Sequence, residues 1–115
     1  GKPYFAFDER WLKSLTATPA SKLSIVRVEG DSMAPTLNPG DDLLIDHDDR
    51  EERIRDGIYV LRVDDALVVK RIALNPMRRR VTVQSDNPAY PDWPDCDMDS
   101  VKCIGRVIWT GRKLV

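Results

Sequence analysis

The 115-residue sequence has only two cysteines and one histidine and contains no long apolar run. Cys96 and Cys103 cannot form the disulfide framework of a small secreted domain, and with one histidine they suggest no zinc site. We therefore expect two unpaired thiols, a cytoplasmic protein, and neither metal nor cofactor. No stretch approaches the roughly 20 apolar residues that span a bilayer, and no signal peptide is recognisable. We therefore do not expect a membrane protein.

The sequence also lacks an excess of either charge, with 18 basic residues against 19 acidic ones. A domain that binds nucleic acid by itself normally carries a strong positive excess to neutralise phosphates. The basic cluster Arg78, Arg79 and Arg80 is therefore interpreted as part of a solvated turn. Any contact with operator DNA would have to come from another domain.

The pattern of apolar and turn-forming residues predicts a compact, mostly β, barrel-like domain with one short N-terminal helix. The helix is expected over residues 7–15 with Asp8 as its cap, and a loop over 16–22. Strands are expected at 23–29, 42–46, 57–63, 66–74, 80–85 and 101–115, with a turn at 38–40, a charged loop at 47–56, a hairpin at Asp64 and Asp65, an irregular segment at 86–99 and a bend at Gly105.

The chain divides into residues 1–22, an N-terminal helix and linker remnant, and residues 23–115, the domain proper. The start "GKPYFAFDERWL" has no initiator methionine, so a fragment of a longer protein is expected. "SDNPAY" at residues 85–90 is interpreted as an Asn-Pro turn in which Tyr90 covers a core edge. Trp93 and Trp109 are interpreted as packing residues.

Ser32, in "VEGDSMAPTLNPGD", is the first candidate for chemistry. Gly30 permits a sharp turn before it, and Pro35 suits the first turn of a short helix. Unpaired N–H groups at such a helix start could cap the serine or stabilise an oxyanion forming beside it. Both interpretations stay open on this stretch alone, because serine is also a common helix cap.

A nucleophilic serine needs a base, and His47 is a poor candidate for that base. It lies in the acidic loop "IDHDDREE", where neighbouring carboxylates favour the charged imidazolium over the neutral form. A divalent metal on Asp46, Asp48 and Asp49 is disfavoured too, since their spacing matches no calcium loop.

Lys70 is the better candidate for the base. In "ALVVKRI" strand alternation places it on one face with Ala66, Val68 and Ile72, so its amine is expected among aliphatic neighbours. Desolvation lowers the pKa of a lysine and makes it a usable base near neutral pH. The alternative is a lysine that extends to water from an edge strand. Serine and lysine together form a known nucleophile–base pair.

Four blocks, "VEGDSMAPTLNPGDDLLID", "DGIYVLRVDDALVVKRI", "VTVQSDNPAYP" and "IGRVIWTGRKL", occur in this order. The series resembles the C-terminal peptidase domain of LexA-type repressors and of phage repressors, the phage branch more closely. The resemblance implies that Ser32 is the nucleophile, that Lys70 is the general base, and that the backbone N–H groups of Ser32 and Met33 form the oxyanion hole. Type I signal peptidases share the serine–lysine pair but carry membrane segments.

The resemblance also implies intramolecular cleavage of an Ala-Gly or Cys-Gly bond in an upstream linker, stimulated by the activated RecA filament. Cleavage would separate a helix-turn-helix reader of operator DNA from this domain, which forms a homodimer through its C-terminal strand region, and would relieve repression in a DNA-damage or prophage-type response. Neither dipeptide and no helix-turn-helix pattern occurs in this sequence. Two alternatives therefore remain, a non-catalytic dimerisation and sensor domain controlled by an antirepressor, and a peptidase that acts in trans.

Overall fold

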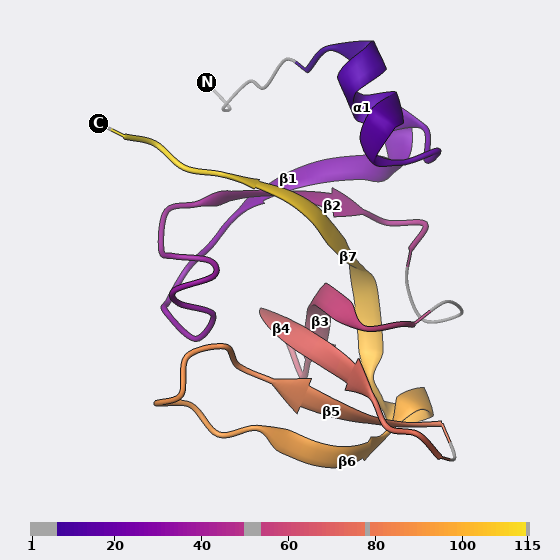
Figure 1. Ribbon diagram of the computed structural model, residues 1–115, viewed down its shortest axis with the longest axis vertical. Helices are drawn as coiled ribbons and strands as arrows, with labels where there is room; N and C mark the ends of the chain where they lie inside the picture. Colours follow the sequence, from indigo (N-terminus) through magenta and orange to yellow (C-terminus); the bar gives the residue numbers. More distant parts are fainter. Residues whose placement is uncertain (1–6, 50–53, 78, 115) are drawn as a thin grey trace.

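The computed structural model describes residues 7–49, 54–77 and 79–114, which form one antiparallel sheet, one α-helix and two short 3-10 helices (Figure 1). In chain order the elements are α1 (Glu9–Leu15), η1 (Ala20–Lys22), β1 (Leu23–Arg27), β2 (Asp42–Asp46), β3 (Gly57–Val63), β4 (Ala66–Leu74), β5 (Arg80–Gln84), β6 (Trp93–Asp97), η3 (Met98–Ser100) and β7 (Lys102–Gly111). The prediction of a mostly β fold with one short N-terminal helix is confirmed.

The N-terminal helix forms where its cap predicts it. The Asp8 carboxylate accepts hydrogen bonds from the backbone N–H groups of Arg10 and Trp11, which satisfies two donors that have no partner inside the helix. Phe7 and Trp11 stack at 5.1 Å between ring centroids, and the edge of Trp109 in β7 meets both rings. Among the described residues no helix is long and apolar enough to cross a membrane.

Strands β2, β3 and β4 have the predicted bounds, and Asp64, in the hairpin between β3 and β4, adopts a φ of 52°. The predicted irregular segment is wrong in one part, because residues 93–97 form β6, which pairs with β5. This strand lies at the edge of the sheet. Pro94 has no N–H to donate, and an edge strand tolerates that loss better than an interior strand does. With one proline and two aspartates in five residues, β6 has no strand-like sequence pattern.

The sheet runs in the order β1-β2-β7-β3-β4-β5-β6, so β1 and β6 are its two edges. The long strand β7 joins two groups of strands, β1 and β2 on one side and β3 to β6 on the other (Figure 1). The predicted bend at Gly105 is confirmed, because the pairing register shifts there. A Cβ at Gly105 would lie 2.7 Å from the Asp46 carbonyl oxygen, so only glycine permits this close approach.

Two hydrophobic clusters fill the interior, and the first of them holds the connection from β1 to β2. Its buried members are Val28, Met33, Leu37, Leu43, Ile45 and Val60. The second lies among β3, β4, β5 and β7, with buried members Tyr59, Leu61, Ile72, Val81, Val83 and Cys103. Ser32 thus lies beside the first cluster, whereas Lys70 shares its strand with Ile72 of the second.

Candidate functional site

Ser32 lies on a bend whose neighbours are anchored in the core. Gly30, two residues earlier, has a φ of 75°, in the left-handed region that glycine adopts without steric cost. Met33 and Leu37 follow, and each is only 2% exposed in the first hydrophobic cluster. Ser32 itself is half-buried, so its hydroxyl lies at the surface of a turn whose position the core fixes.

The short helix expected at Pro35 is absent. Residues 31–37 form turns, in which the N–H of Leu37 donates to the carbonyl of Met33 at 2.9 Å. The Asn38–Gly40 turn follows at once, so the chain has room for a single turn and no further helical hydrogen bonds. Ser32 is therefore presented by a turn rather than by a helix N-terminus.

The hydroxyl and two backbone N–H groups of the Ser32 bend are available for hydrogen bonding. Within the described residues, the hydroxyl of Ser32 makes no hydrogen bond, and the backbone N–H groups of Ser32 and Met33 find no acceptor. Unpaired amides beside a hydroxyl are the arrangement that stabilises an oxyanion in acyl transfer. The bend thus offers an available hydroxyl together with available donors.

Lys70 extends from β4 toward the connection from β5 to β6 and the first residue of β6. Its side chain is buried, with the residue 8% exposed, and its Nζ donates to Ser85 Oγ at 2.7 Å. The rings of Tyr90 and Trp93 flank the amine, with centroids 5.7 and 5.6 Å from Nζ. The expected aliphatic surroundings are therefore wrong in part, because aromatic rings and a hydroxyl face the amine.

Burial lowers the pKa of the Lys70 amine below its ordinary value, since the charged form loses hydration. Across the described chain no carboxylate forms an ion pair with this amine. The inward direction of Lys70 and the lowered pKa both follow the sequence expectation. A lysine of this kind can accept a proton more readily than a solvated one.

The β5–β6 connection also holds the Ser32 bend. The backbone N–H of Asn87 donates to the Ser32 carbonyl at 3.0 Å, and the Asn87 side-chain amide donates to the Asp31 carbonyl at 3.0 Å. The Tyr90 hydroxyl donates to the Asp31 carboxylate at 2.5 Å, and this carboxylate raises the pKa of Tyr90. One connection therefore contacts the serine bend and the lysine amine.

Asp86, in the same connection, links the Ser32 bend to the strand that carries Lys70. Its carboxylate accepts two hydrogen bonds from the Arg71 guanidinium, both at 2.8 Å, and one from the Thr36 hydroxyl at 2.6 Å. The Arg71 guanidinium lowers the pKa of Asp86 because it stabilises the ionised carboxylate. Arg71 lies next to Lys70 in β4, so this bridge fixes the strand and the bend to each other.

The role of "SDNPAY" does not follow from its sequence. The segment is typical of a turn, yet its side chains contact Lys70, Arg71 and the Ser32 bend. The available signal was the succession of Ser85, Asp86 and Asn87, whose short polar side chains commonly bond to backbone or charged groups. Their partners are distant in sequence, so the pattern alone could not identify them.

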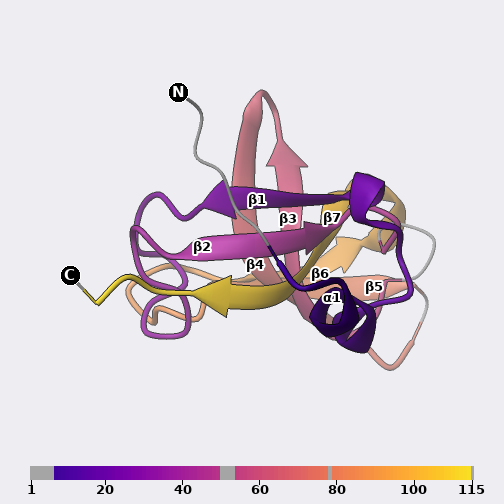
Figure 2. The same ribbon diagram turned by 90° about the horizontal axis from the view of Figure 1, so that it is seen from above.

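An apolar cleft of about 260 Å³ opens beside Ser32, between the edge strand β1 and the β3–β4 hairpin. Figure 2 shows this hairpin projecting near β1. The cleft is lined by Val26, Arg27, Val28, Glu29, Gly30, Ser32, Met33, Val60, Leu67, Val68 and Val69. Because β1 pairs with β2 alone among the described strands, its other edge keeps backbone groups that an extended peptide could bond.

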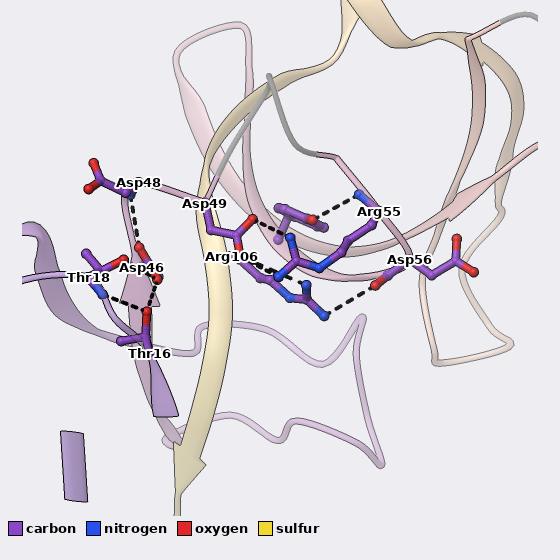
Figure 3. Close-up of polar contacts among 9 residues, drawn as sticks. Thr16, Thr18, Asp46, Asp48, Asp49, Arg55, Asp56 and Arg106 are labelled. Carbon is purple, nitrogen blue, oxygen red and sulfur yellow. Dashed lines mark hydrogen bonds and ion pairs between the residues drawn. The ribbon is translucent and has the colours of Figure 1, made fainter. Parts of the chain in front are cut away.

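The acidic residues at the end of β2 and directly after it are bonded to protein groups (Figure 3). Asp46 is 3% exposed and accepts hydrogen bonds from the hydroxyls of Thr16 and Thr18, at 2.7 and 2.8 Å. Asp49 makes a two-point contact with the Arg55 guanidinium, at 3.0 and 2.7 Å. These contacts attach the loop before β1 to β2 and give the carboxylates a structural role.

His47 bonds to a serine other than Ser32. Its Nε2 lies 2.6 Å from the hydroxyl of Ser24 in β1, and its backbone N–H donates to the Lys22 carbonyl. The single histidine therefore continues the pairing of β1 with β2. Among the described residues it forms no hydrogen bond with the Ser32 bend.

The basic cluster and the cysteines have ordinary surroundings. Arg79 pairs with Asp99 and Arg80 with Asp95, both on exposed surface, whereas Arg78 lies outside the described residues. Cys96 and Cys103 form no disulfide. The expectation that both cysteines are thiols, not joined in a disulfide, is confirmed.

The chain is similar to known proteins. The model of the family described as Peptidase S24-like matches residues 2–108. A curated relative, the 26 kDa repressor protein of Escherichia phage HK022, is 36% identical over 80 residues, which cover 65% of this chain and 31% of the relative. The chain thus spans about a third of the length of that relative.

Proposed function

The chain belongs to the Peptidase S24-like family, and we propose that it is the regulatory part of a repressor that cuts its own upstream linker. In this proposal Ser32 is the nucleophile and Lys70 the general base. The likeness to a phage repressor supports the regulatory role. The open hydroxyl on the bend and the buried lysine support the chemistry.

The proposed reaction begins with attack of Ser32 Oγ on the carbonyl carbon of the linker peptide bond. Neutral Lys70 takes the hydroxyl proton, and the backbone N–H groups of Ser32 and Met33 stabilise the negative oxygen that forms. The intermediate then collapses, Lys70 returns the proton to the leaving amine nitrogen, and the peptide bond breaks. Water later releases the acyl group from Ser32, so the net reaction is hydrolysis.

One observation carries the proposal: a single short connection bonds to both proposed catalytic residues. Ser85 accepts a hydrogen bond from Lys70, and Asn87 donates one to Ser32. Two positions of chain span at most about 7 Å, so the two attachment points are close together. Proton transfer needs nucleophile and base within about 3 Å of each other, and the shared connection supports an approach of the two side chains.

The cleft beside Ser32 supports a peptide as the substrate. Its apolar lining suits small apolar side chains, and the open edge of β1 offers backbone hydrogen bonds to an extended segment. A linker attached to the same chain would reach this cleft at high effective concentration. For this reason we propose an intramolecular reaction rather than capture of a free peptide.

The test uses the full-length protein with its upstream linker. Incubation across a pH series should give two fragments, faster at higher pH as Lys70 loses its proton. Ser32→Ala and Lys70→Ala should each slow cleavage by roughly 10³-fold or more, as loss of a nucleophile or base does in other serine peptidases. Gel electrophoresis and mass spectrometry of the fragments measure the rate.

Ser24→Ala serves as the matched control, because Ser24 contacts His47 and lies outside the proposed machinery. It should cleave at the wild-type rate. Equal cleavage by wild type, Ser32→Ala and Lys70→Ala would sink the proposal.

The remaining parts of the proposal concern the whole protein. We propose a cytoplasmic homodimer that binds operator DNA through a separate helix-turn-helix domain and is induced by the activated RecA filament in a DNA-damage or prophage-type response. β2 pairs with residues 106–111 of β7 and β3 pairs with residues 102–106, so part of each edge of β7 has no strand pairing among the described residues. Sedimentation that shows only monomer at high micromolar concentration would contradict the dimer.

One observation favours a second candidate, a non-catalytic sensor domain controlled by an antirepressor. The Lys70 amine bonds to Ser85 rather than to the Ser32 hydroxyl. An upstream linker that contains Ala-Gly or Cys-Gly favours self-cleavage, and a linker without either favours the sensor. Sequencing the region before Gly1 separates the two.

A further inference from the structure

Ser85 occupies a fixed position at the end of β5. It is 9% exposed, and its backbone N–H donates to the Asp92 carboxylate at 3.3 Å, which ties it to the other end of the β5–β6 connection. The preceding residue, Gln84, pairs with Arg71 in β4, next to Lys70. The Ser85 hydroxyl is therefore held beside Lys70 by backbone contacts that do not depend on the hydroxyl itself.

Within the described residues, the hydroxyl of Ser85 is the one hydrogen-bond acceptor of the Lys70 amine. The 2.7 Å bond to Ser85 Oγ is its hydrogen bond, while Tyr90 and Trp93 contribute ring faces. Ring faces attract a cation but leave its N–H groups free to rotate. Only the hydroxyl can set the direction in which the amine points.

We propose that Ser85 is a positioning residue, whose hydroxyl orients the Lys70 amine for proton transfer from Ser32. This inference rests on the function proposed above. Neutral lysine has two N–H groups and one lone pair. When one N–H donates to Ser85 Oγ, rotation about the Cε–Nζ bond is restricted, and the lone pair is available to the serine proton.

The same hydrogen bond has a consequence for protonation. A hydroxyl that accepts from the amine stabilises the charged form, so Ser85 opposes the effect of burial on Lys70. The other ionisable groups around this place are engaged elsewhere. Asp92 accepts from the Ser85 amide, Tyr90 donates to Asp31, and the Tyr59 hydroxyl, on the strand opposite Lys70, accepts from the Arg55 amide. Asp86 is paired with Arg71.

The experiment compares four variants of the full-length protein, Ser85→Ala, Ser85→Cys, Ser85→Thr and Thr82→Ala. Cysteine keeps the size of serine but is a weak acceptor, whereas threonine keeps the hydroxyl. Thr82 lies in β5, the strand that Ser85 directly follows, and bonds to Asn75, so its variant is the matched control. Cleavage rates are measured across a pH series, and the Lys70 titration is followed by NMR in a Ser32→Ala background.

Ser85→Ala and Ser85→Cys should lower the maximum cleavage rate about tenfold, as expected for loss of one hydrogen bond to a charged group. They should also move the pH midpoint of cleavage and the NMR titration down by about one unit, because the charged form loses a partner. Ser85→Thr and Thr82→Ala should match the wild type in both measurements. A merely structural role for Ser85 would leave the midpoint unchanged.

Wild-type rate and midpoint in Ser85→Ala and Ser85→Cys would overturn the proposal. So would an unchanged Lys70 titration in folded Ser85→Cys, even if Ser85→Ala fails to fold. Absence of cleavage in the wild type would overturn the proposed function and with it the catalytic part of this inference. A lowered NMR midpoint would in that case still support the hydrogen bond from Lys70 to Ser85.

Discussion

Two polar regions of this protein differ in how completely their groups are bonded. In the region around Asp46 and Asp49 the buried carboxylate of Asp46 bonds to threonine hydroxyls, and the half-buried carboxylate of Asp49 bonds to an arginine (Figure 3). In the Ser32–Lys70 region, as far as the structure describes it, the serine hydroxyl has no partner and the buried amine has no counter-ion. Both regions are formed by segments distant in sequence.

The difference separates polar groups that stabilise the fold from those available for chemistry. A fully bonded buried carboxylate contributes to stability, and it loses reactivity because its lone pairs are occupied. An open hydroxyl beside unpaired amides contributes little to stability but can react. The comparison predicts that substitutions in the first region change the free energy of unfolding, whereas those in the second change the cleavage rate.

The largest change in stability is expected for Asp46→Ala. It would leave two threonine hydroxyls and the Asp48 amide without their acceptor, at a cost of about 2–3 kcal/mol in the free energy of unfolding. Denaturant unfolding measures this loss. Asp48→Ala is the control, because the Asp48 side chain is 45% exposed and pairs only with Lys22. Equal stability of both variants would contradict the structural role of Asp46.

A smaller change is expected for Asp86→Asn, which weakens the bridge from Arg71 to Thr36. The loss should be about 1–2 kcal/mol near neutral pH. The pKa of Asp86 is lowered in the folded protein, so its stabilisation is present above the ordinary aspartate pKa of about 3.9 and is lost as pH falls through the folded value. Asp86→Asn should therefore lose less stability than the wild type on acidification.

Unfolding curves at pH 7 and at acidic pH measure both effects. Asp95→Asn is the matched control, since Asp95 pairs with Arg80 but its side chain is 72% exposed. No measurable loss of stability is expected for it. If Asp95→Asn lost as much stability at pH 7 as Asp86→Asn, the buried bridge would stabilise the fold no more than the surface pair does. That result would contradict the prediction.

The smallest change in stability is expected for Lys70→Met. Methionine replaces a desolvated amine with an apolar group of similar length, so the free energy of unfolding should stay within about 1 kcal/mol or rise. Cleavage should nevertheless be lost. Thermal unfolding and the cleavage assay, performed on the same sample, check the two parts. A large loss of stability would show that Lys70 belongs with the structural groups.

Local sequence features were sufficient for much of the fold. The bounds of β2, β3 and β4 follow from short apolar runs between turn signals, and α1 follows from its cap at Asp8. The inward direction of Lys70 follows from strand alternation, because successive side chains of a strand point to opposite faces. Each of these features depends on residues within a few positions of one another.

The predictions that were wrong concern places where segments distant in sequence contact each other. β6 exists because residues 93–97 pair with β5 and is not marked by its own composition. The Ser32 bend is a turn because the next turn begins at Asn38 and because the β5–β6 connection bonds to it. Of the aromatic rings beside Lys70, Tyr90 belongs to that same connection and Trp93 begins β6.

The sequence by itself determined which residues are candidates, since Ser32 follows a glycine turn and Lys70 lies on an apolar strand. Only the tertiary structure decided what surrounds them. The β5–β6 connection brings Ser85 to the amine and Asn87 to the serine bend, across separations of 15 and 55 residues from Lys70 and Ser32. Such contacts depend on sheet order and register, which side-chain patterns within one strand do not contain.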